Sequence, residues 1–129
     1  MNRKAAAILA ICMAAALVLV GAAFSRNSMS VKTLKGVVGP GYSISLKMGG
    51  KKVKTLKAGK YKIVVSDKSS IHNFTLEREK PSSPHMEKHI TSTASTGSKT
   101  ITWTLKPGSW RAYCSVHEAL MHQDFKLTK

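Results

Sequence analysis

Cysteine is scarce in this sequence. Cys12 and Cys114 are the only two among 129 residues, and Cys12 lies inside an apolar stretch near the N-terminus. Ile11 precedes Cys12 where a lipoprotein signal needs a small residue, so lipid attachment is not expected there. Export with removal of that stretch would leave Cys114 unpaired in a compartment where cysteines usually pair. Such a cysteine is either a buried thiol that packs as a small hydrophobe or a group with a chemical task.

Acidic residues are also few. Six Asp and Glu stand against 21 Lys and Arg, which gives a formal net charge of +15, or +13 without Arg3 and Lys4. An excess of this size speeds encounter with anionic partners and makes it sensitive to salt. The partners that fit are an acidic redox protein, an anionic membrane surface or a cell-wall polyanion. Alternatively, the lysines bind no partner and are simply the solvent-exposed residues of strands and turns.

Nucleic acid is not an expected partner, because the lysines are not interleaved with stacking aromatic residues, which make up only 6% of the chain. The lysines are instead scattered along strand-like segments, as Lys47, Lys51, Lys52, Lys54, Lys57, Lys60 and Lys62.

The N-terminal segment has the layout of an export signal. Arg3 and Lys4 precede an apolar stretch from Ala5 to Val20, and small residues follow at positions 21–23, so cleavage is predicted before Phe24. The stretch is also long enough to cross a bilayer as an uncleaved anchor through residues 5–24. With either outcome, the protein is predicted to be extracytoplasmic, which means in the periplasm, at the cell surface or secreted. The fold is then preceded by an N-terminal signal or anchor helix.

Three parts of the chain follow from this layout. Residues 1–23 are predicted to be the signal peptide or membrane anchor. Residues 24–36 are polar and weakly patterned, so they are predicted to be a tether. Residues 37–129 are predicted to form one folded domain.

No convincing long helical pattern occurs in the predicted domain, where short alternating segments predict an all-β fold. Seven or eight strands separated by turns are typical of a Greek-key antiparallel β-sandwich. The segment 78–98 has two prolines and no sustained periodicity, so it is predicted to be a long surface excursion with a helical turn near residues 86–90. The predicted strands cover residues 42–48, 60–65, 71–77, 100–105, 109–115 and 124–128.

Four residues form a constellation with a chemical meaning. Cys114, His117 and Met121 lie within eight residues just after a strand, and His72 lies in a distant one. A thiolate, two imidazoles and a thioether are the ligands of a type 1 (blue) copper site, with the Met as a weak axial ligand. The predicted cofactor is therefore one copper ion that cycles between Cu(II) and Cu(I).

These segments resemble those of a known family. Residues 110–121, Trp-Arg-Ala-Tyr-Cys-Ser-Val-His-Glu-Ala-Leu-Met, followed by Phe125, resemble the C-terminal copper loop of the plastocyanin/azurin-type cupredoxins. Residues 70–74 resemble their N-terminal ligand segment, and residues 56–61 resemble the turn before it. The resemblance covers residues 41–129. It implies a cupredoxin-like sandwich with three equatorial ligands and one axial ligand, which are His72, Cys114, His117 and Met121.

The resemblance also implies that Asn73 and the backbone after Cys114, at Ser115, steady the sulfur by hydrogen bonding. The chain departs from the family pattern at Val116, where a proline is usual, and at Gln123 or Asp124, where a glycine is common. These departures concern the stiffness of the loop more than the identity of the ligands.

The axial position has alternatives. His122 stands one residue beyond Met121, where some cupredoxins keep their Met, and Glu118 also lies in the loop. His85 and His89 are four residues apart around Met86, so they would form a second weak metal patch if that segment is helical. Alternatively, these two histidines are exposed loop residues that bind no metal.

The predicted function is single-electron transfer between redox partners by an exported mononuclear copper protein that is a monomer and not an enzyme. The alternative is an extracytoplasmic protein that binds and delivers copper. A third possible function is a catalytic or ligand-binding copper site, in which one coordination position is open or Glu118 binds the copper. A dinuclear copper centre is excluded because it needs two bridging cysteines. The chain is too short for the further domains that copper oxidases and nitrite reductases need.

Overall fold

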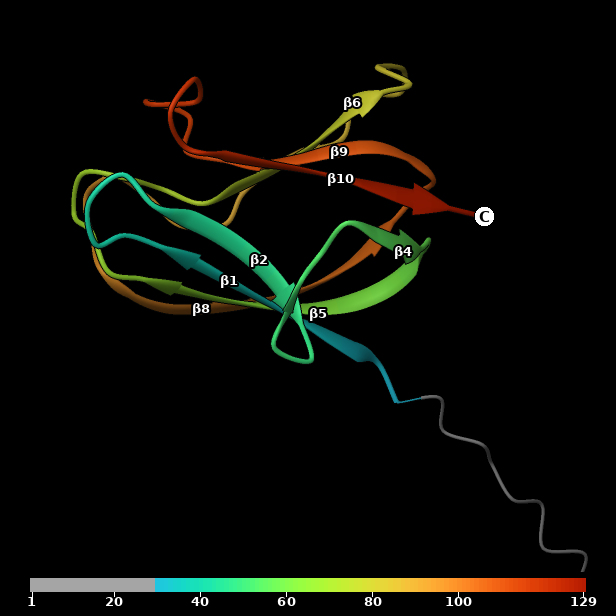
Figure 1. Cartoon of the computed structure of the whole chain (residues 1–129), viewed down its shortest axis with the longest axis horizontal. Coiled ribbons are helices and arrows are strands. Elements are labelled where there is room, and N and C mark those ends of the chain that lie inside the picture. Colours follow the sequence, from blue (N-terminus) through green and yellow to red (C-terminus); the bar gives the residue numbers. More distant parts are fainter. Residues whose placement is uncertain (1–29) are drawn as a thin grey trace, which may run out of the picture.

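Two five-stranded β-sheets pack face to face in the computed structural model, which describes residues 30–129 (Figure 1). The first sheet has the order β3 (Lys51–Lys52), β2 (Ile44–Met48), β1 (Lys32–Val38), β5 (Gly59–Asp67), β8 (Gly97–Leu105). The second has the order β4 (Thr55–Lys57), β10 (His122–Thr128), β9 (Gly108–Tyr113), β6 (Thr75–Lys80), β7 (Glu87–His89). The prediction of an all-β sandwich is confirmed.

The described residues contain ten strands, more than the seven or eight expected, because β3, β4 and β7 are edge strands of only two or three residues. The pairing also differs from a purely antiparallel sandwich. Strand β1 is parallel to β5, and β10 is parallel to β4. Alternation in a sequence reports which face of a strand is buried, but it carries no information on the direction of the neighbouring strand.

Strand β1 corrects the predicted boundary of the domain. The sequence predicts a tether over residues 24–36, yet residues 32–36 belong to the first sheet, where Leu34 is fully buried. Gly36 lies against Phe74, and a Cβ atom at this position would lie 2.7 Å from its Cζ atom. The ordered domain therefore includes Lys32. The predicted signal or anchor, and residues 24–29 of the tether, lie outside the described residues.

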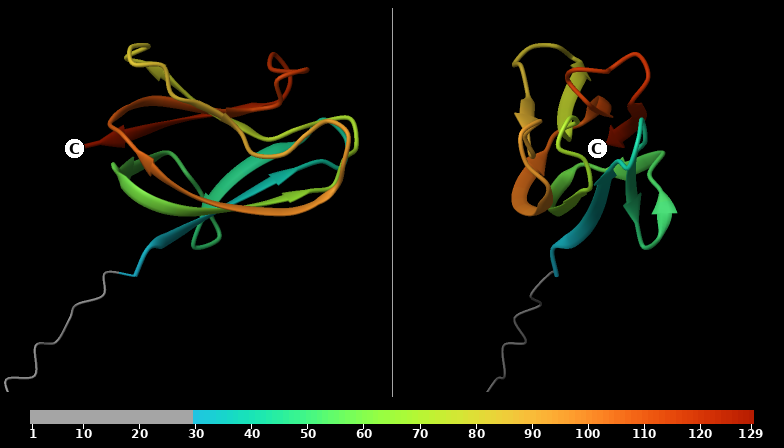
Figure 2. Two further views of the ribbon diagram at one scale, coloured as in Figure 1. Left: turned by 180° about the vertical axis from the view of Figure 1, so that it is seen from behind. Right: turned by 90° about the vertical axis from the view of Figure 1, so that its left-hand side faces the viewer.

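Figure 2 shows the two sheets packed against each other, and the buried hydrophobic side chains form one core cluster between them. Alternate residues of the strands face this core, as Ile63 and Val65 do in β5 and Trp110 and Ala112 in β9, all of which are buried. The Trp110 indole donates a hydrogen bond to the carbonyl of Lys106 at 2.9 Å. Each buried aliphatic or aromatic side chain contributes about 1.5–3 kcal/mol by leaving water, so this core holds the two sheets together.

Gln123 connects the two sheets through a polar contact inside the core. Its side-chain Oε1 accepts a hydrogen bond from the backbone N–H of Leu46 at 2.9 Å. Its Nε2 donates to the carbonyls of Leu46 and Val53 at 3.0 and 2.9 Å. The side chain is buried, and from β10 of the second sheet it satisfies backbone groups of β2 and of the segment between β3 and β4.

The excursion between β6 and β8 contains a strand in place of the predicted helical turn. Residues 87–89 form β7, which pairs antiparallel with β6. The sequence prediction failed here because edge pairing with β6 satisfies the backbone of a three-residue segment that is too short to show periodicity. Within residues 30–129, no helix has the length and apolar character needed to cross a bilayer.

Candidate metal centre

Three of the four predicted ligands meet at one end of the sandwich. The Nδ1 atoms of His72 and His117 lie 3.0 Å apart, and the Sγ of Cys114 lies 3.8 Å from each of them. Among the described residues, this is the group of His, Cys, Asp and Glu whose ligand atoms all lie within 4.8 Å of one another. His72 and Cys114 are buried and His117 is partly exposed. Three lone-pair donors thus converge in a site that reaches solvent at one edge.

A compact turn after β9 holds two of the three donors. The backbone N–H of His117 donates to the carbonyl of Cys114 at 3.1 Å, and the N–H of Met121 donates to the carbonyl of His117 at 2.8 Å. The N–H of Cys114 donates to the carbonyl of Met121 at 3.0 Å, which closes the turn where β10 begins. These bonds fix the positions of Cys114 and His117 relative to each other before any metal binds.

The segment before β6 supplies the third donor. His72 and Asn73 precede the strand, which begins at Thr75 and not at residue 71 as predicted. Asn73 accepts a hydrogen bond from the backbone N–H of Ser115 and donates one to its hydroxyl, both at 2.8 Å. The amide therefore ties the His72 segment to the residue after Cys114. The resemblance implies that Asn73 steadies the sulfur by hydrogen bonding, whereas in the structure the hydrogen bonds of the Asn73 amide go to Ser115.

The three candidates for the axial ligand, Met121, His122 and Glu118, differ in burial and in hydrogen-bond partners. The Met121 side chain is buried, whereas His122 is exposed and its Nδ1 lies 2.8 Å from the carbonyl of Glu118. Glu118 is exposed as well, and its carboxylate forms an ion pair with Arg111 at 2.7 Å. Of the three candidates for an axial ligand, Met121 is the one that lies inside the domain.

Tyr42 belongs to the site although the sequence did not indicate it. The alternating pattern predicts a strand that begins at Tyr42, yet β2 begins at Ile44 and Tyr42 is 60% exposed. Its ring centroid lies 5.1 Å from those of both His72 and His117. The Tyr42 ring therefore covers the two imidazoles on the solvent side. Its position next to Gly41, which has a positive φ of 66°, is the local signal that the strand had not yet begun.

Solved structures have the same architecture. A single-substitution mutant of rusticyanin aligns over 77% of this chain and 80% of its own, with 18% identity and a TM-score of 0.52. Auracyanin A, a "blue" copper protein from Chloroflexus aurantiacus, aligns over 74% of this chain and 98% of its own, with 16% identity and a TM-score of 0.50. The chain has the cupredoxin fold. No protein-family model and no curated protein sequence matches it.

The donors of this cupredoxin domain suit one copper ion. A thiolate is a soft ligand that favours Cu(I), and imidazole nitrogens serve both oxidation states. The His72 and His117 rings stand nearly perpendicular, at 78°, so that each presents its Nδ1 to the other and to the sulfur. The arrangement is that of a trigonal His₂Cys site.

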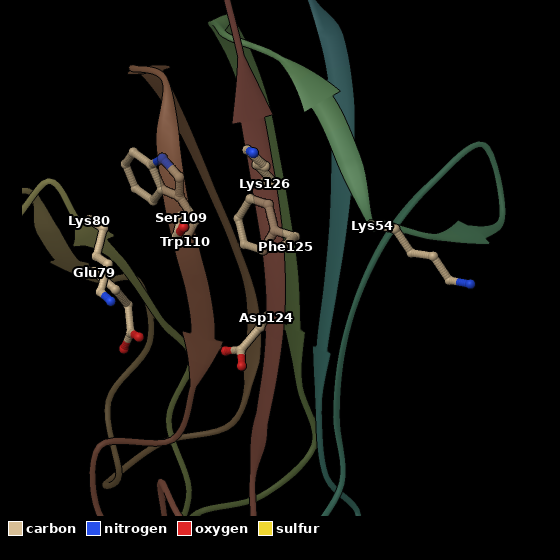
Figure 3. A pocket seen from close by; sticks show the side chains of 8 residues that line it. All are labelled: Lys54, Glu79, Lys80, Ser109, Trp110, Asp124, Phe125 and Lys126. Carbon is tan, nitrogen blue, oxygen red and sulfur yellow. The ribbon is translucent and has the colours of Figure 1, made fainter.

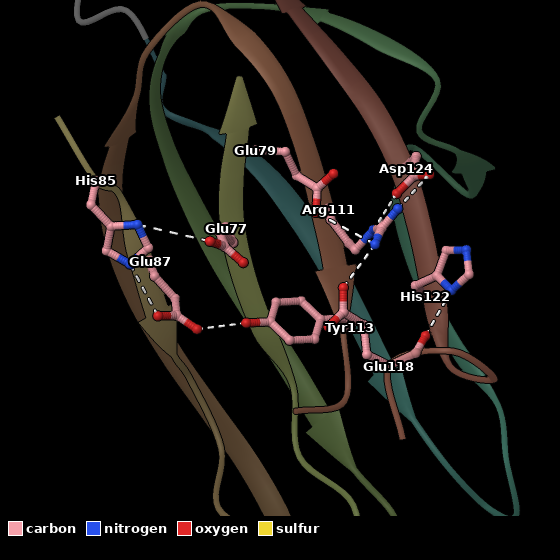
Figure 4. A network of polar contacts seen from close by, with 9 residues as sticks. All are labelled: Glu77, Glu79, His85, Glu87, Arg111, Tyr113, Glu118, His122 and Asp124. Carbon is pink, nitrogen blue, oxygen red and sulfur yellow. Dashed lines mark hydrogen bonds and ion pairs between the residues drawn. The ribbon is translucent and has the colours of Figure 1, made fainter. Parts of the chain in front are cut away.

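An ion-pair network anchors the metal-binding turn to the outer face of the second sheet (Figure 4). Arg111 of β9 binds Asp124 of β10 through two hydrogen bonds of 2.7 and 3.1 Å. The same guanidinium donates to Glu118, the residue after His117, at 2.7 Å. Glu79 lies 3.5 Å from it. Arg111 thus links the turn that carries His117 to two strands.

This network predicts a specific dependence of stability on pH. The hydrogen bond from Arg111 holds the pKa of Asp124 below its ordinary value of 3.8. A carboxyl with a lowered pKa stabilises the fold above its unfolded pKa, and this contribution disappears as pH falls through the folded pKa. We expect Asp124→Asn to cost less than about 1 kcal/mol at neutral pH, because the pair is exposed.

Thermal unfolding of the wild type and of Asp124→Asn between neutral pH and about pH 2 checks this prediction. The stability difference between the two proteins should shrink as pH falls below about 4. An equal difference at every pH would show that Asp124 stabilises the fold by another route.

The two histidines of the excursion both lie near Glu87, and Figure 4 shows His85 with Glu87 and Tyr113. The Nε2 of His85 lies 3.2 Å from a Glu87 carboxylate oxygen, and the Nε2 of His89 lies 3.5 Å from the other. Tyr113 donates a hydrogen bond of 2.5 Å to Glu87, which lowers the pKa of that carboxyl. Burial, and then the Glu87 bond, raise the pKa of Tyr113. The helical spacing on which a second metal patch depended is absent, because these residues lie on and before β7.

Proposed function

We propose that the protein is an exported blue copper protein that carries single electrons. The observation that carries this proposal is the convergence of the His72 and His117 Nδ1 atoms on the Cys114 sulfur. We assign these three residues as equatorial ligands and the buried Met121 as the axial ligand. Bound copper would supply a one-electron couple between Cu(II) and Cu(I).

The protein supports such a role by keeping the donors still. Cys114 and His117 are held by the hydrogen bonds of one turn, and the Asn73 amide holds the His72 segment to that turn. A rigid donor set limits the rearrangement that accompanies a change of oxidation state. Such a framework favours fast electron exchange, which is what a carrier needs and a metal-delivery protein does not.

The site also offers an edge for electron exchange. His117 is the ligand that is partly exposed. Four large apolar residues with exposed side chains lie on or next to the two segments that carry the histidines, or against their rings, and exposed apolar residues grouped in this way mark an interaction surface. These residues are Tyr42, Ile71, Val116 and Leu120. We infer that a redox partner protein docks on this apolar rim.

The remaining parts of the proposal rest on composition. The apolar N-terminal stretch supports export and an extracytoplasmic location, with or without retention of the anchor. The formal net charge, +15 for the whole sequence and +13 without Arg3 and Lys4, supports an acidic redox partner, a salt-dependent encounter and a monomer. We propose a carrier and not an enzyme, because two imidazoles and a thiolate held in one place are the donor set of an electron-transfer copper site.

Titration of the purified protein with Cu(II), followed by visible spectroscopy, tests the proposal. We expect an intense blue absorption that saturates at one copper per chain and is bleached by a mild reductant. A colourless complex that gives up its copper readily to a chelator would contradict electron transfer and favour the delivery function. The second metal patch considered at His85 and His89 has little support in the fold, because Glu87 lies close to both histidines.

A further inference from the structure

The charges of the domain are segregated between the two sheets. Of the six acidic residues, five lie on the second sheet or on the turn that precedes β10, and Asp67 is buried at the end of β5. The five are Glu77, Glu79, Glu87, Glu118 and Asp124. The outer face of the first sheet therefore has no acid, although it is rich in lysine.

Five exposed lysines form this outer face. Four of them alternate with the buried residues of β1, β2 and β5, and the fifth, Lys52 of β3, lies directly opposite Lys47 of β2. We call these five residues the lysine face: Lys35, Lys47, Lys52, Lys60 and Lys62. The remaining outward positions are small and uncharged, such as Thr33 beside Lys62 and Thr104 beside Lys60. The face is thus cationic without interruption by the opposite charge.

The lysine face costs stability. Lys35 is the direct cross-strand neighbour of Lys47, and Lys47 is the direct neighbour of Lys52. Like charges directly opposite each other destabilise a sheet. The ion pairs among the described residues involve Arg111, His85 or His89, and none involves a lysine. A row of three unpaired lysines on adjacent strands is not explained by folding, which points to a ligand outside the domain.

The second sheet shows the contrasting arrangement. A shallow pocket of about 440 Å³ on its outer side has lysines and acids together in its lining (Figure 3). The lysines are Lys54, Lys80 and Lys126, and the acids are Glu79 and Asp124. Mixed charges of this kind are typical of an ordinary solvated surface. The two faces of the same domain thus differ in charge pattern and not only in the number of lysines.

We propose that the lysine face docks on an anionic phospholipid surface. Sheet faces with regularly spaced lysines present several ammonium groups to one plane, which suits a layer of lipid phosphates. The chain enters this sheet from the apolar stretch that ends at Val20, and residues 21–31 span at most roughly 40 Å. A retained anchor would therefore hold the lysine face within reach of a bilayer.

The location of the lysine face separates it from the surface for a redox partner. The β1–β2 pairing runs from Val38 opposite Ile44, near the metal-binding end, to Lys35 opposite Lys47. In Figure 1, β1 starts at the end of the sandwich opposite to the turn 114–121. The net positive charge of the whole domain can attract an acidic redox partner, which then contacts the apolar rim near His117 and not the lysine face. Docking through this face leaves the metal centre open to a second partner.

Lysine footprinting of the full chain tests this proposal. The protein is mixed with vesicles of phosphatidylcholine alone, or of equal parts phosphatidylcholine and phosphatidylglycerol, and acetylation of each lysine is followed by mass spectrometry. We expect the lysine face to react several-fold more slowly with the anionic vesicles only, and to recover in high salt. Lys54, Lys80 and Lys126 should react equally in both.

A matched pair of triple variants sharpens the test. The first variant removes the row of three lysines through the substitutions Lys35→Gln, Lys47→Gln and Lys52→Gln. The second variant removes the same charge around the pocket of mixed charge, through Lys54→Gln, Lys80→Gln and Lys126→Gln. Each lysine at an anionic surface contributes about fivefold. The first triple is therefore expected to lower the docking equilibrium roughly 100-fold and to abolish protection of Lys60 and Lys62. The second triple should keep that protection.

Three results would overturn the proposal. One is equal reactivity of the lysine face with both kinds of vesicle, and another is equal loss of protection in both triple variants. The third is protection by a soluble polyanion, such as polyphosphate, without protection by anionic vesicles, which would assign the face to an anionic polymer. Thermal unfolding of both variants confirms that each is folded. None of these readouts depends on copper.

Discussion

Replacing Cys114 by serine should abolish the blue colour of the copper-loaded protein completely. The intense visible absorption of a type 1 site arises from charge transfer between the thiolate sulfur and Cu(II), and a serine hydroxyl has no comparable donor. Cys114 is fully buried with its Sγ 3.8 Å from the Nδ1 atoms of His72 and His117. The comparison of visible spectra for the two proteins at one copper per chain checks the prediction.

Met121→Leu is the matched control for this experiment. The substitution nearly conserves volume in the buried position, so the protein should fold and keep the equatorial donors. We expect the blue absorption to persist and the reduction potential to rise, because the lost thioether would have stabilised Cu(II) more than Cu(I). Colour in Cys114→Ser, or loss of colour in Met121→Leu alone, would contradict the assignment of these two ligands.

Gln123→Leu should cause a large loss of stability. The leucine has a similar size, but it removes the hydrogen bonds to the N–H and carbonyl of Leu46 and to the carbonyl of Val53. A buried polar group without a partner costs about 1–3 kcal/mol. We expect a total loss of about 2–5 kcal/mol and a fall in Tm of about 10 °C or more, measured by thermal and denaturant unfolding.

Lys126→Gln is the control on the same strand. Lys126 is exposed in β10 and its substitution should change the free energy of unfolding by less than about 0.5 kcal/mol. If Gln123→Leu is as stable as the wild type, water or relaxation of the loop before β4 satisfies the backbone groups, and the glutamine has no structural role. Failure of Gln123→Leu to fold would support the prediction if the control folds normally.

Much of the candidate centre was predictable from the sequence, because its residues are chemically specific and partly local. Cys114 and His117 are separated by two residues, so a single turn can present both. His72 lies far away in the chain, but its Asn73-Phe74 context identified it, and the structure brings all three donors together. The sequence left Met121 and His122 as alternatives for the axial position, and the structure adds that Met121 is buried and His122 is exposed.

Other features of the site and the fold had no local signal. The position of Tyr42 over both imidazoles depends on where β2 begins. Gln123 was noted only as a departure from a common glycine, yet it bridges the sheets. Residues 32–36 resembled a tether because their lysines dominate the pattern, and their place in the sheet depends on pairing with β2 and β5.

The sequence alone determined the residue types of the donor set, the alternation that makes the chain a sandwich, and the excess of positive charge. These are properties of single residues and of their near neighbours. Tertiary structure decided which strands pair, which side chains cover the donors, and how the charges divide between the two sheets. Contacts of this kind join residues far apart in the chain, and packing of the whole core sets them, so the periodicity of a segment does not contain them.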